Sequence, residues 1–134
     1  MRIVLDINVF ISGVFFRGTP YLILDAWRKG KVNIVLSGEI FDEYQRVARE
    51  LSEQFKEVNI SIFLDLLIVN AIWIEAPQLP FNVSTDPNDD KFLSCALASR
   101  TKVIVSGDKH LLVLSGYREI EVIKPKTFID RYLK

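Results

Sequence analysis

The stretch TDPNDDKFLSCALASRTKVIVSGDKHLL, residues 85–112, decides the fold. It contains an acidic turn over 84–90, an almost wholly apolar segment at 92–98 and a short β-branched run at 102–106. A helix that is apolar nearly all round is a buried helix, and so brief a β-branched run is typical of a strand. A glycine ends this run, so Asp108 is expected just beyond the end of a central strand.

The N-terminus shows the same pattern, a short apolar strand followed by an aspartate. An apolar strand is expected at 2–5, Asp6 ends it, and a helix begins at Asn8. If this strand lies beside the one at 102–106 in a parallel sheet, Asp6 and Asp108 emerge at the same edge. In open α/β sheets, ligands bind in the crevice outside the carboxyl ends of the strands.

Strands and helices alternate along the rest of the chain. Further helices are expected at 19–29, 38–51, 55–70, a helical turn at 110–114 and a terminal helix from 125, with strands at 33–36, 71–75 and 119–123. This alternation predicts an α/β fold with a mostly parallel central sheet and helices on both faces. The length predicts one domain over residues 1–134.

Composition limits the classes of protein to consider. Hydrophobic residues make up 49% and charged residues 25% of the chain, as in an ordinary globular domain. We find no apolar run near the ~20 residues that cross a bilayer, and no signal peptide, so we expect a cytoplasmic protein with no membrane partner. Lys and Arg total 17, as do Asp and Glu. A nucleic-acid-binding protein of zero net charge needs local positive charge, or metal ions that offset its acids.

Four acids are candidates for one site. They are Asp6, Glu43, Asp90 and Asp108, with Glu43 at the edge of the apolar face of its helix. Four carboxylates in one cleft repel each other unless a cation neutralises them, and oxygen ligands favour Mg²⁺ or Mn²⁺. Such an ion can activate water beside a phosphate, so phosphodiester hydrolysis fits this set. We expect Asp86 and Asp89 to be turn and cap residues instead.

Each of the four acids also has a structural alternative. Asp90 could only cap its helix, and Asp6 could only cap the turn into the first helix. Glu43 could pair with Arg46 on a solvated helix face, and Asp108 could belong to an ordinary turn. The joint placement of the acids at one rim favours the functional interpretation over these separate ones.

Four motifs in order resemble those of PIN-domain proteins. They are LDINVFISG at 5–13, SGEIFDEYQRV at 37–47, DPNDDKFLSCALA at 86–98 and VIVSGDKHLL at 103–112. The resemblance spans nearly the whole chain and is closest to the VapC-like toxins of toxin–antitoxin systems. It implies a three-layer α/β/α, Rossmann-like domain and a metal-dependent ribonuclease acting on single-stranded RNA. It also implies a homodimer held inactive by a small antitoxin protein.

The resemblance assigns roles to individual residues. The four acids of the family match Asp6, Glu43, Asp90 and Asp108, as metal ligands and catalytic groups. Its polar residue near the first acid matches Asn8, and a hydroxyl near the site matches Ser12 or Ser106. The sequence departs from the family at His110, where related sequences commonly carry an acid.

Substrate contacts need positive charge near these acids. Lys91 and Lys109 each flank a site acid and are candidates to bind RNA phosphates, although either could be solvated surface. A non-catalytic RNA- or protein-binding module of the same fold is the main alternative function. A phosphate-handling signalling domain fits less well, because it needs an acid pair after the first strand and only Asp6 stands there.

Overall fold

A five-stranded parallel sheet organises the chain. The computed structural model describes residues 1–134 except 78, 80–82 and 85. The strands are β1 (Arg2–Leu5), β2 (Asn33–Leu36), β3 (Ile72–Trp73), β4 (Val103–Val105) and β5 (Glu121–Ile123). Their order in the sheet is β3-β2-β1-β4-β5, and every neighbouring pair is parallel. The α/β class and the parallel sheet are therefore confirmed.

Seven α-helices surround the sheet within the described residues. They are α1 (Ile7–Phe15), α2 (Thr19–Arg28), α3 (Gly38–Ser52), α4 (Ile60–Asn70), α5 (Asp90–Ser99), α6 (Lys109–Leu112) and α7 (Pro125–Phe128). Single turns of 3-10 helix occupy Pro87–Asp89 and Tyr117–Glu119, and a π-helical turn at Ile129–Leu133 continues α7. The turn expected at 84–90 includes residue 85, which lies outside the described residues.

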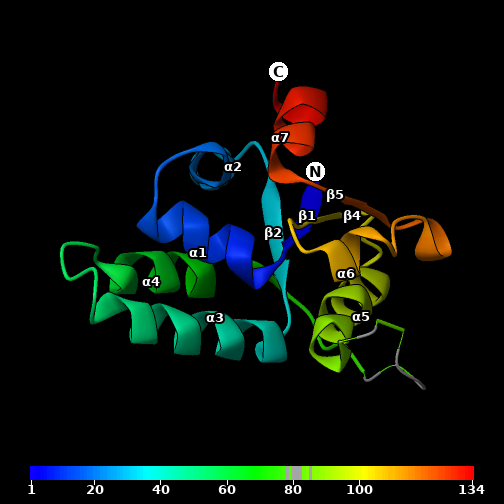
Figure 1. Cartoon of the computed structure of the whole chain (residues 1–134), viewed down its shortest axis with the longest axis horizontal. Coiled ribbons are helices and arrows are strands. Elements are labelled where there is room, and N and C mark those ends of the chain that lie inside the picture. The colour runs from blue at the N-terminus through cyan, green and yellow to red at the C-terminus, as the bar shows by residue number, and fades with distance from the viewer. Residues whose placement is uncertain (78, 80–82, 85) are drawn as a thin grey trace.

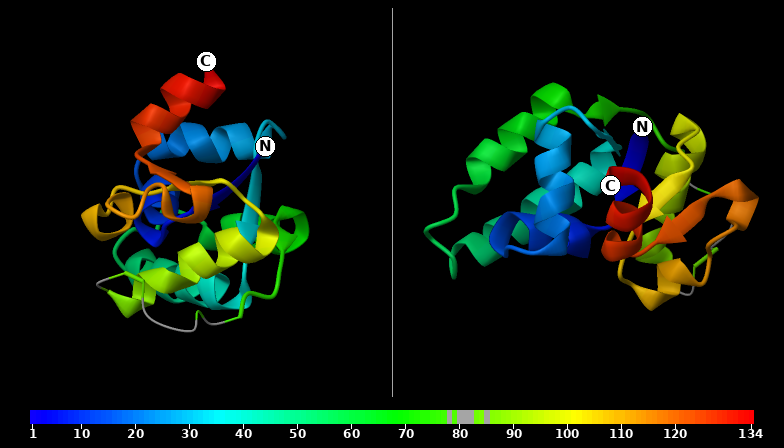
Figure 2. Two further views of the ribbon diagram at one scale, coloured as in Figure 1. Left: turned by 90° about the vertical axis from the view of Figure 1, so that its right-hand side faces the viewer. Right: turned by 90° about the horizontal axis from the view of Figure 1, so that it is seen from above.

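The helices form two layers around the sheet. Helices α1 to α4 lie on one side of the strands, and α5 and α6 lie on the other (Figure 1). Helix α7 packs against α2 near the chain ends (Figure 2). The order of the strands explains these layers. The chain first moves across the sheet from β1 to β2 to β3, and then returns through α5 to β4. Because each crossover is right-handed, helices that connect strands in the first direction lie on one face, and those that connect strands in the opposite direction lie on the other.

The middle of the sheet is completely buried. In β1 the side chains of Ile3, Val4 and Leu5 are 0% exposed, and α5 also buries the apolar Phe92 and Leu93. Strands covered on both faces are expected to be apolar without alternation, as these are. Because β1 and β4 pair with Leu5 opposite Val105, the next residues, Asp6 and Ser106, meet at one edge of the sheet.

Several expected elements differ in length: β4 and β5 have three residues each in place of the expected five, and α4 and β3 differ as well. Helix α4 begins at Ile60, not near 55, because the Asn59 side chain accepts a hydrogen bond from the Ser61 N–H (3.1 Å) and caps the helix there. The edge strand β3 has two residues in place of the expected five. None of these differences alters the edge of the sheet at which Asp6 emerges.

No single helix in the described part of the chain is long and apolar enough to cross a membrane. Helices α1 and α2 would reach that length and composition only together, and they are bent by 88° relative to each other.

Candidate functional site

Asp6 forms the centre of the site. It follows β1 directly, is 1% exposed, and accepts a hydrogen bond at Oδ2 from the Ser106 hydroxyl (2.8 Å). Its side chain makes no capping bond to α1, so a simple cap does not describe it. Burial raises the pKa of Asp6 above its usual value, and the charges of Asp108 and Glu43 raise it further, against the opposing effect of its hydrogen bonds.

Ser106 links Asp6 to Asp108. Its hydroxyl donates to Asp6 and accepts from the backbone N–H of Asp108 (3.0 Å), while its side chain is fully buried. One carboxylate oxygen of Asp108 accepts from the His110 N–H (2.8 Å) and caps α6. Asp108 thus serves as a helix cap and also lies close enough to Asp6 to alter its pKa.

Asp89 was expected from the sequence only as a cap of the helix that follows it. It is 7% exposed, and its buried Oδ2 has no hydrogen-bond partner among the described residues. Burial raises the pKa of Asp89 to about 6, and the negative charges of Asp108, Asp6 and Asp86 contribute to that rise. A buried carboxylate oxygen without a partner is costly, so a missing ligand is one physical explanation for it.

Asp90 has a different position from the one expected. Its two carboxylate oxygens accept hydrogen bonds from the backbone N–H groups of Val83 (3.0 Å) and Ser84 (2.8 Å). The side chain therefore holds Val83 and Ser84 against the start of α5. These contacts favour its neighbour Asp89 as the acid that belongs with Asp6 and Asp108, and the role expected for Asp90 stays a prediction.

Asp89 is in line with the buried face of α5. It precedes Phe92 by three residues, Leu93 by four and Ala96 by seven, and all three side chains are buried. At helical spacing these positions share one face. The same spacing from Asp90 leads to Leu93 and Ser94, which are also buried, and to Leu97, which is partly buried, so this spacing does not separate the two aspartates.

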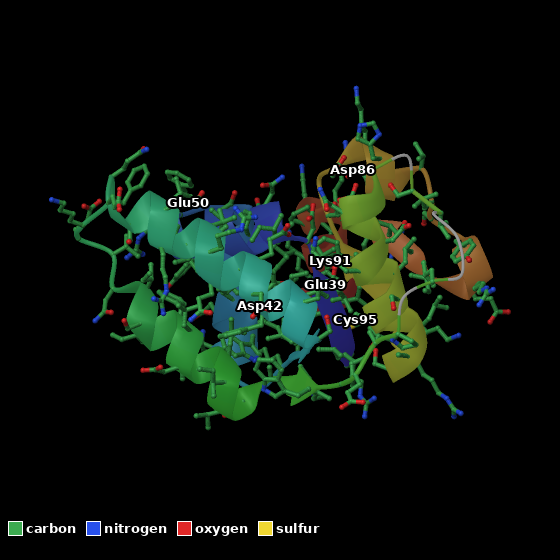
Figure 3. The ribbon with its side chains drawn as sticks, turned by 90° about the horizontal axis from the view of Figure 1, so that it is seen from below. Glu39, Asp42, Glu50, Asp86, Lys91 and Cys95 are labelled. Atoms are coloured by element: carbon green, nitrogen blue, oxygen red, sulfur yellow. The ribbon has the colours of Figure 1, made fainter. Side chains whose placement is uncertain are left out.

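Glu43 faces α5 from the neighbouring helix α3. It is half-buried, and its Oε2 lies 3.1 Å from the Nζ of Lys91. Arg46, the alternative partner, pairs with Glu50 instead (3.4 Å). Lys91, which we expected to bind substrate, is 8% exposed and lies between α3 and α5 (Figure 3), where its ammonium also donates to the Asn88 carbonyl (2.6 Å).

The remaining candidates lie around this centre. Asn8 is exposed in the first turn of α1, and Ser12 is partly buried one turn further along. Lys109 is exposed at the start of α6, next to Asp108, and His110 is exposed beside it. Of the two hydroxyls considered, Ser106 is the one that bonds to a site acid.

The donor atoms suit a hard divalent cation. Asp6, Asp89 and Asp108 supply carboxylate oxygens; the charge of Asp108 raises the pKa of both Asp6 and Asp89, and Asp89 has an oxygen with no hydrogen-bond partner among the described residues. In the described ranges, however, no three His, Cys, Asp or Glu side chains are gathered closely enough to hold a metal ion as they stand. The residues therefore fit the ion by chemical type, charge and burial, and the side chains would have to close around it.

Comparison with known proteins agrees with this geometry. The sequence model of a family described as "PIN domain" matches residues 2–110, a range that includes Asp6, Glu43, Asp89 and Asp108. The uncharacterized protein MJ1680 of Methanocaldococcus jannaschii is 28% identical over 145 aligned residues, which cover 100% of this chain and 93% of that protein.

Proposed function

Because the chain belongs to the PIN domain family, whose members are typically nucleases, we propose that it is a metal-dependent endoribonuclease of single-stranded RNA. The observation that carries this proposal is the convergence of Asp6, Asp89 and Asp108 at the carboxyl edge of the sheet, with a buried Asp89 oxygen that lacks a partner within the described part of the chain. Three mutually repelling acids at a ligand-binding edge weaken a metal-free protein and are useful to a protein that binds a cation.

In this proposal Asp6, Asp89 and Asp108 hold Mg²⁺ or Mn²⁺, and Glu43 stands beside them on α3. The bound ion supplies charge neutralisation at a phosphate and an activated water. Ser106 keeps the Asp6 carboxylate oriented and joins it to the Asp108 turn. Asp90 fixes the start of α5, so that Asp89 points toward the other acids.

The chain's own cations would position the substrate. Lys109 is exposed next to Asp108 and is the better placed of the two lysines to bind an RNA phosphate, since Lys91 is buried and paired. Asn8 and Ser12 lie on the first turns of α1, next to Asp6, and would contact substrate or water there.

Cleavage of single-stranded RNA with Mn²⁺, with Mg²⁺ and with EDTA tests the proposal. Wild type should cut only with the metals, and Asp6→Asn should remove cutting while circular dichroism stays unchanged. Asp65→Asn, an exposed acid on α4, is the matched control and should cut normally. Equal cutting by wild type and Asp6→Asn would refute the site.

The alternative is a binding module of the same fold that does not cut. Such a module gains nothing from buried like charges, and the Asp89 oxygen that no described residue bonds weighs against it. A melting-temperature rise with Mn²⁺ in a protein that cuts no tested RNA would favour a narrow RNA target. No rise would favour the module.

We also propose the partners that the resemblance implies: a second copy of the chain and a small antitoxin protein, with action in the cytoplasm. Helix α4 offers a surface for self-association, since Ile62, Ile68 and Val69 are 55%, 52% and 78% exposed. Sedimentation of wild type should give a dimer, and Val69→Lys should shift it toward the monomer. A wild-type monomer at high concentration would refute the dimer.

A further inference from the structure

The ion pair between Lys91 and Glu43 differs from the other ion pairs of the described chain. Its two side chains are 7% and 21% exposed, whereas every other pair has at least one partner exposed by 41% or more. The pair also joins α3 to α5 at the acid site, and the Asn88 carbonyl accepts a second hydrogen bond from the same ammonium (2.6 Å). Burial of a lysine destabilises a protein unless an opposite charge and hydrogen bonds compensate it, so these two partners fix the position of the Lys91 ammonium.

The Lys91 ammonium offsets part of the negative charge of the site. It bonds directly to Glu43, and it lowers the pKa of Asp89 against the larger effects of burial and neighbouring acids. Glu43 in turn acts on the pKa of Asp6. Lys91 is therefore the cation that is electrostatically linked to both sides of the acid group.

We propose that Lys91 replaces a second metal ion, so that the site takes a single divalent cation at Asp6, Asp89 and Asp108. This inference rests on the proposed function. Four carboxylates carry four negative charges, and one divalent ion together with one ammonium leaves a single negative charge. A second divalent ion at Glu43 would have to displace the Lys91 ammonium, which lies 3.1 Å from the Glu43 Oε2.

Removal of the Lys91 charge should allow a second divalent ion to bind at Glu43. In Lys91→Met, Glu43 loses its ammonium and joins the other acids as a free oxygen donor. Two divalent ions then neutralise four carboxylates. The double variant Lys91→Met/Glu43→Gln lacks both members of the pair and should again take one ion. Lys109→Met removes an exposed lysine near Asp108 and serves as the matched control.

Isothermal titration calorimetry of the full chain with Mn²⁺ measures these numbers. We expect one ion in wild type, two in Lys91→Met, one in the double variant and one in Lys109→Met. Two ions in wild type, or one in a folded Lys91→Met, would overturn the inference and leave the proposed nuclease intact. No binding by wild type would overturn the proposed function itself.

Glu43→Gln provides a test that does not depend on Lys91→Met folding. If the lysine already occupies Glu43, this variant should bind one Mn²⁺ with a Kd within about threefold of wild type. A tenfold or greater loss of affinity would identify Glu43 as a metal ligand and contradict the role of Lys91. Circular dichroism before each titration confirms that the folded protein is compared.

Discussion

Two adjacent aspartates have opposite environments, and this difference gives a direct test of the site. Asp89 is buried, and one of its oxygens has no partner in the ranges that the structure describes, whereas both oxygens of Asp90 accept backbone hydrogen bonds. Asp90→Asn can accept only one of the two, so we expect a loss of about 1–2 kcal/mol in the free energy of unfolding. Asp89→Asn removes a repelled charge, so its metal-free stability should be unchanged or slightly higher.

In metal-dependent cleavage, Asp89→Asn should be the more strongly impaired of the two variants, although it should be the more stable one. Asp89→Asn should lower it by more than about 100-fold, because loss of even an outer partner of a metal ligand costs 10–100-fold. Asp90→Asn should keep most of its activity at temperatures where it is folded. Urea unfolding and RNA cleavage on the same preparations check both expectations. Loss of activity in Asp90→Asn alone would restore Asp90 as the site acid.

The sequence predicted Asp6 and Asp108 because each follows a strand, and the ends of paired parallel strands meet. It did not separate Asp89 from Asp90. Neighbouring residues at a helix start point about 100° apart, and the docking of Val83 and Ser84 onto Asp90 selects which one faces the sheet edge. That docking is a tertiary contact, and turn composition carries no information about it.

Lys91 could not be placed from sequence for a related reason. Lysine is mostly exposed in proteins, so a lysine beside an acid suggests substrate binding. Its burial depends on Glu43, which is 48 residues away in the chain and meets it only when α3 and α5 pack together.

At the scale of elements, burial in α5 controls the chemistry of the lone cysteine. Cys95 is 0% exposed, and burial raises the pKa of its thiol to about 12. Thiolate is the reactive form, so the native protein at pH 8 should resist iodoacetamide, while the protein in urea should take one label. Intact-mass spectrometry distinguishes the two. Rapid labelling of native protein would mean that α5 is less firmly packed than the structure indicates.

Helix α3 is fixed to the sheet by one buried tyrosine. The Tyr44 hydroxyl donates to the Leu5 carbonyl, just before Asp6, and its ring stacks on Phe10 with centroids 4.3 Å apart. Tyr44→Phe keeps the ring and leaves that carbonyl without this donor, so we expect a loss of about 1–2 kcal/mol in the free energy of unfolding. Urea denaturation measures it.

Tyr132→Phe is the control for this variant, because its hydroxyl bonds to Glu121 at an exposed position and should change stability by less than about 0.5 kcal/mol. Equal stability of Tyr44→Phe and wild type would show that stacking alone holds α3. The helix itself was predictable, because the Ser37 cap and the spacing of its apolar residues lie in the local sequence. The Tyr44 contact joins residues 39 positions apart and could not be inferred that way.

At the scale of the whole molecule, the net charge is zero, but the charged side chains are unevenly distributed. The acids converge on the carboxyl edge of β1 and β4, where Asp6, Asp89 and Asp108 repel each other. The fold therefore concentrates negative charge at one site while the total stays balanced. If the proposed function is correct, RNA binding does not require a basic composition, because a metal ion and a few local lysines would supply the attraction that the average charge lacks.

This concentration of charge predicts how stability depends on pH. The pKa of Asp89 is raised from 3.8 to about 6 in the folded protein, so the folded state binds a proton more tightly than the unfolded state. Its stabilising effect is complete below pH 3.8 and is lost as the pH rises through about 6. Metal-free wild type should therefore lose part of its stability between pH 4 and 7, and Asp89→Asn should lose less.

Metal binding should show the opposite trend, because Mn²⁺ competes with the proton for the same carboxylates. At pH 7.5 and 100 times the Kd, Mn²⁺ should raise the free energy of unfolding by about 2.7 kcal/mol, and at pH 5 the rise should be much smaller. Thermal melts with Mn²⁺ and with EDTA at both pH values measure the difference. An equal Mn²⁺ effect at pH 5 and 7.5 would place the ion away from Asp89, since only a site whose ligands titrate in this range gains affinity as the protons leave.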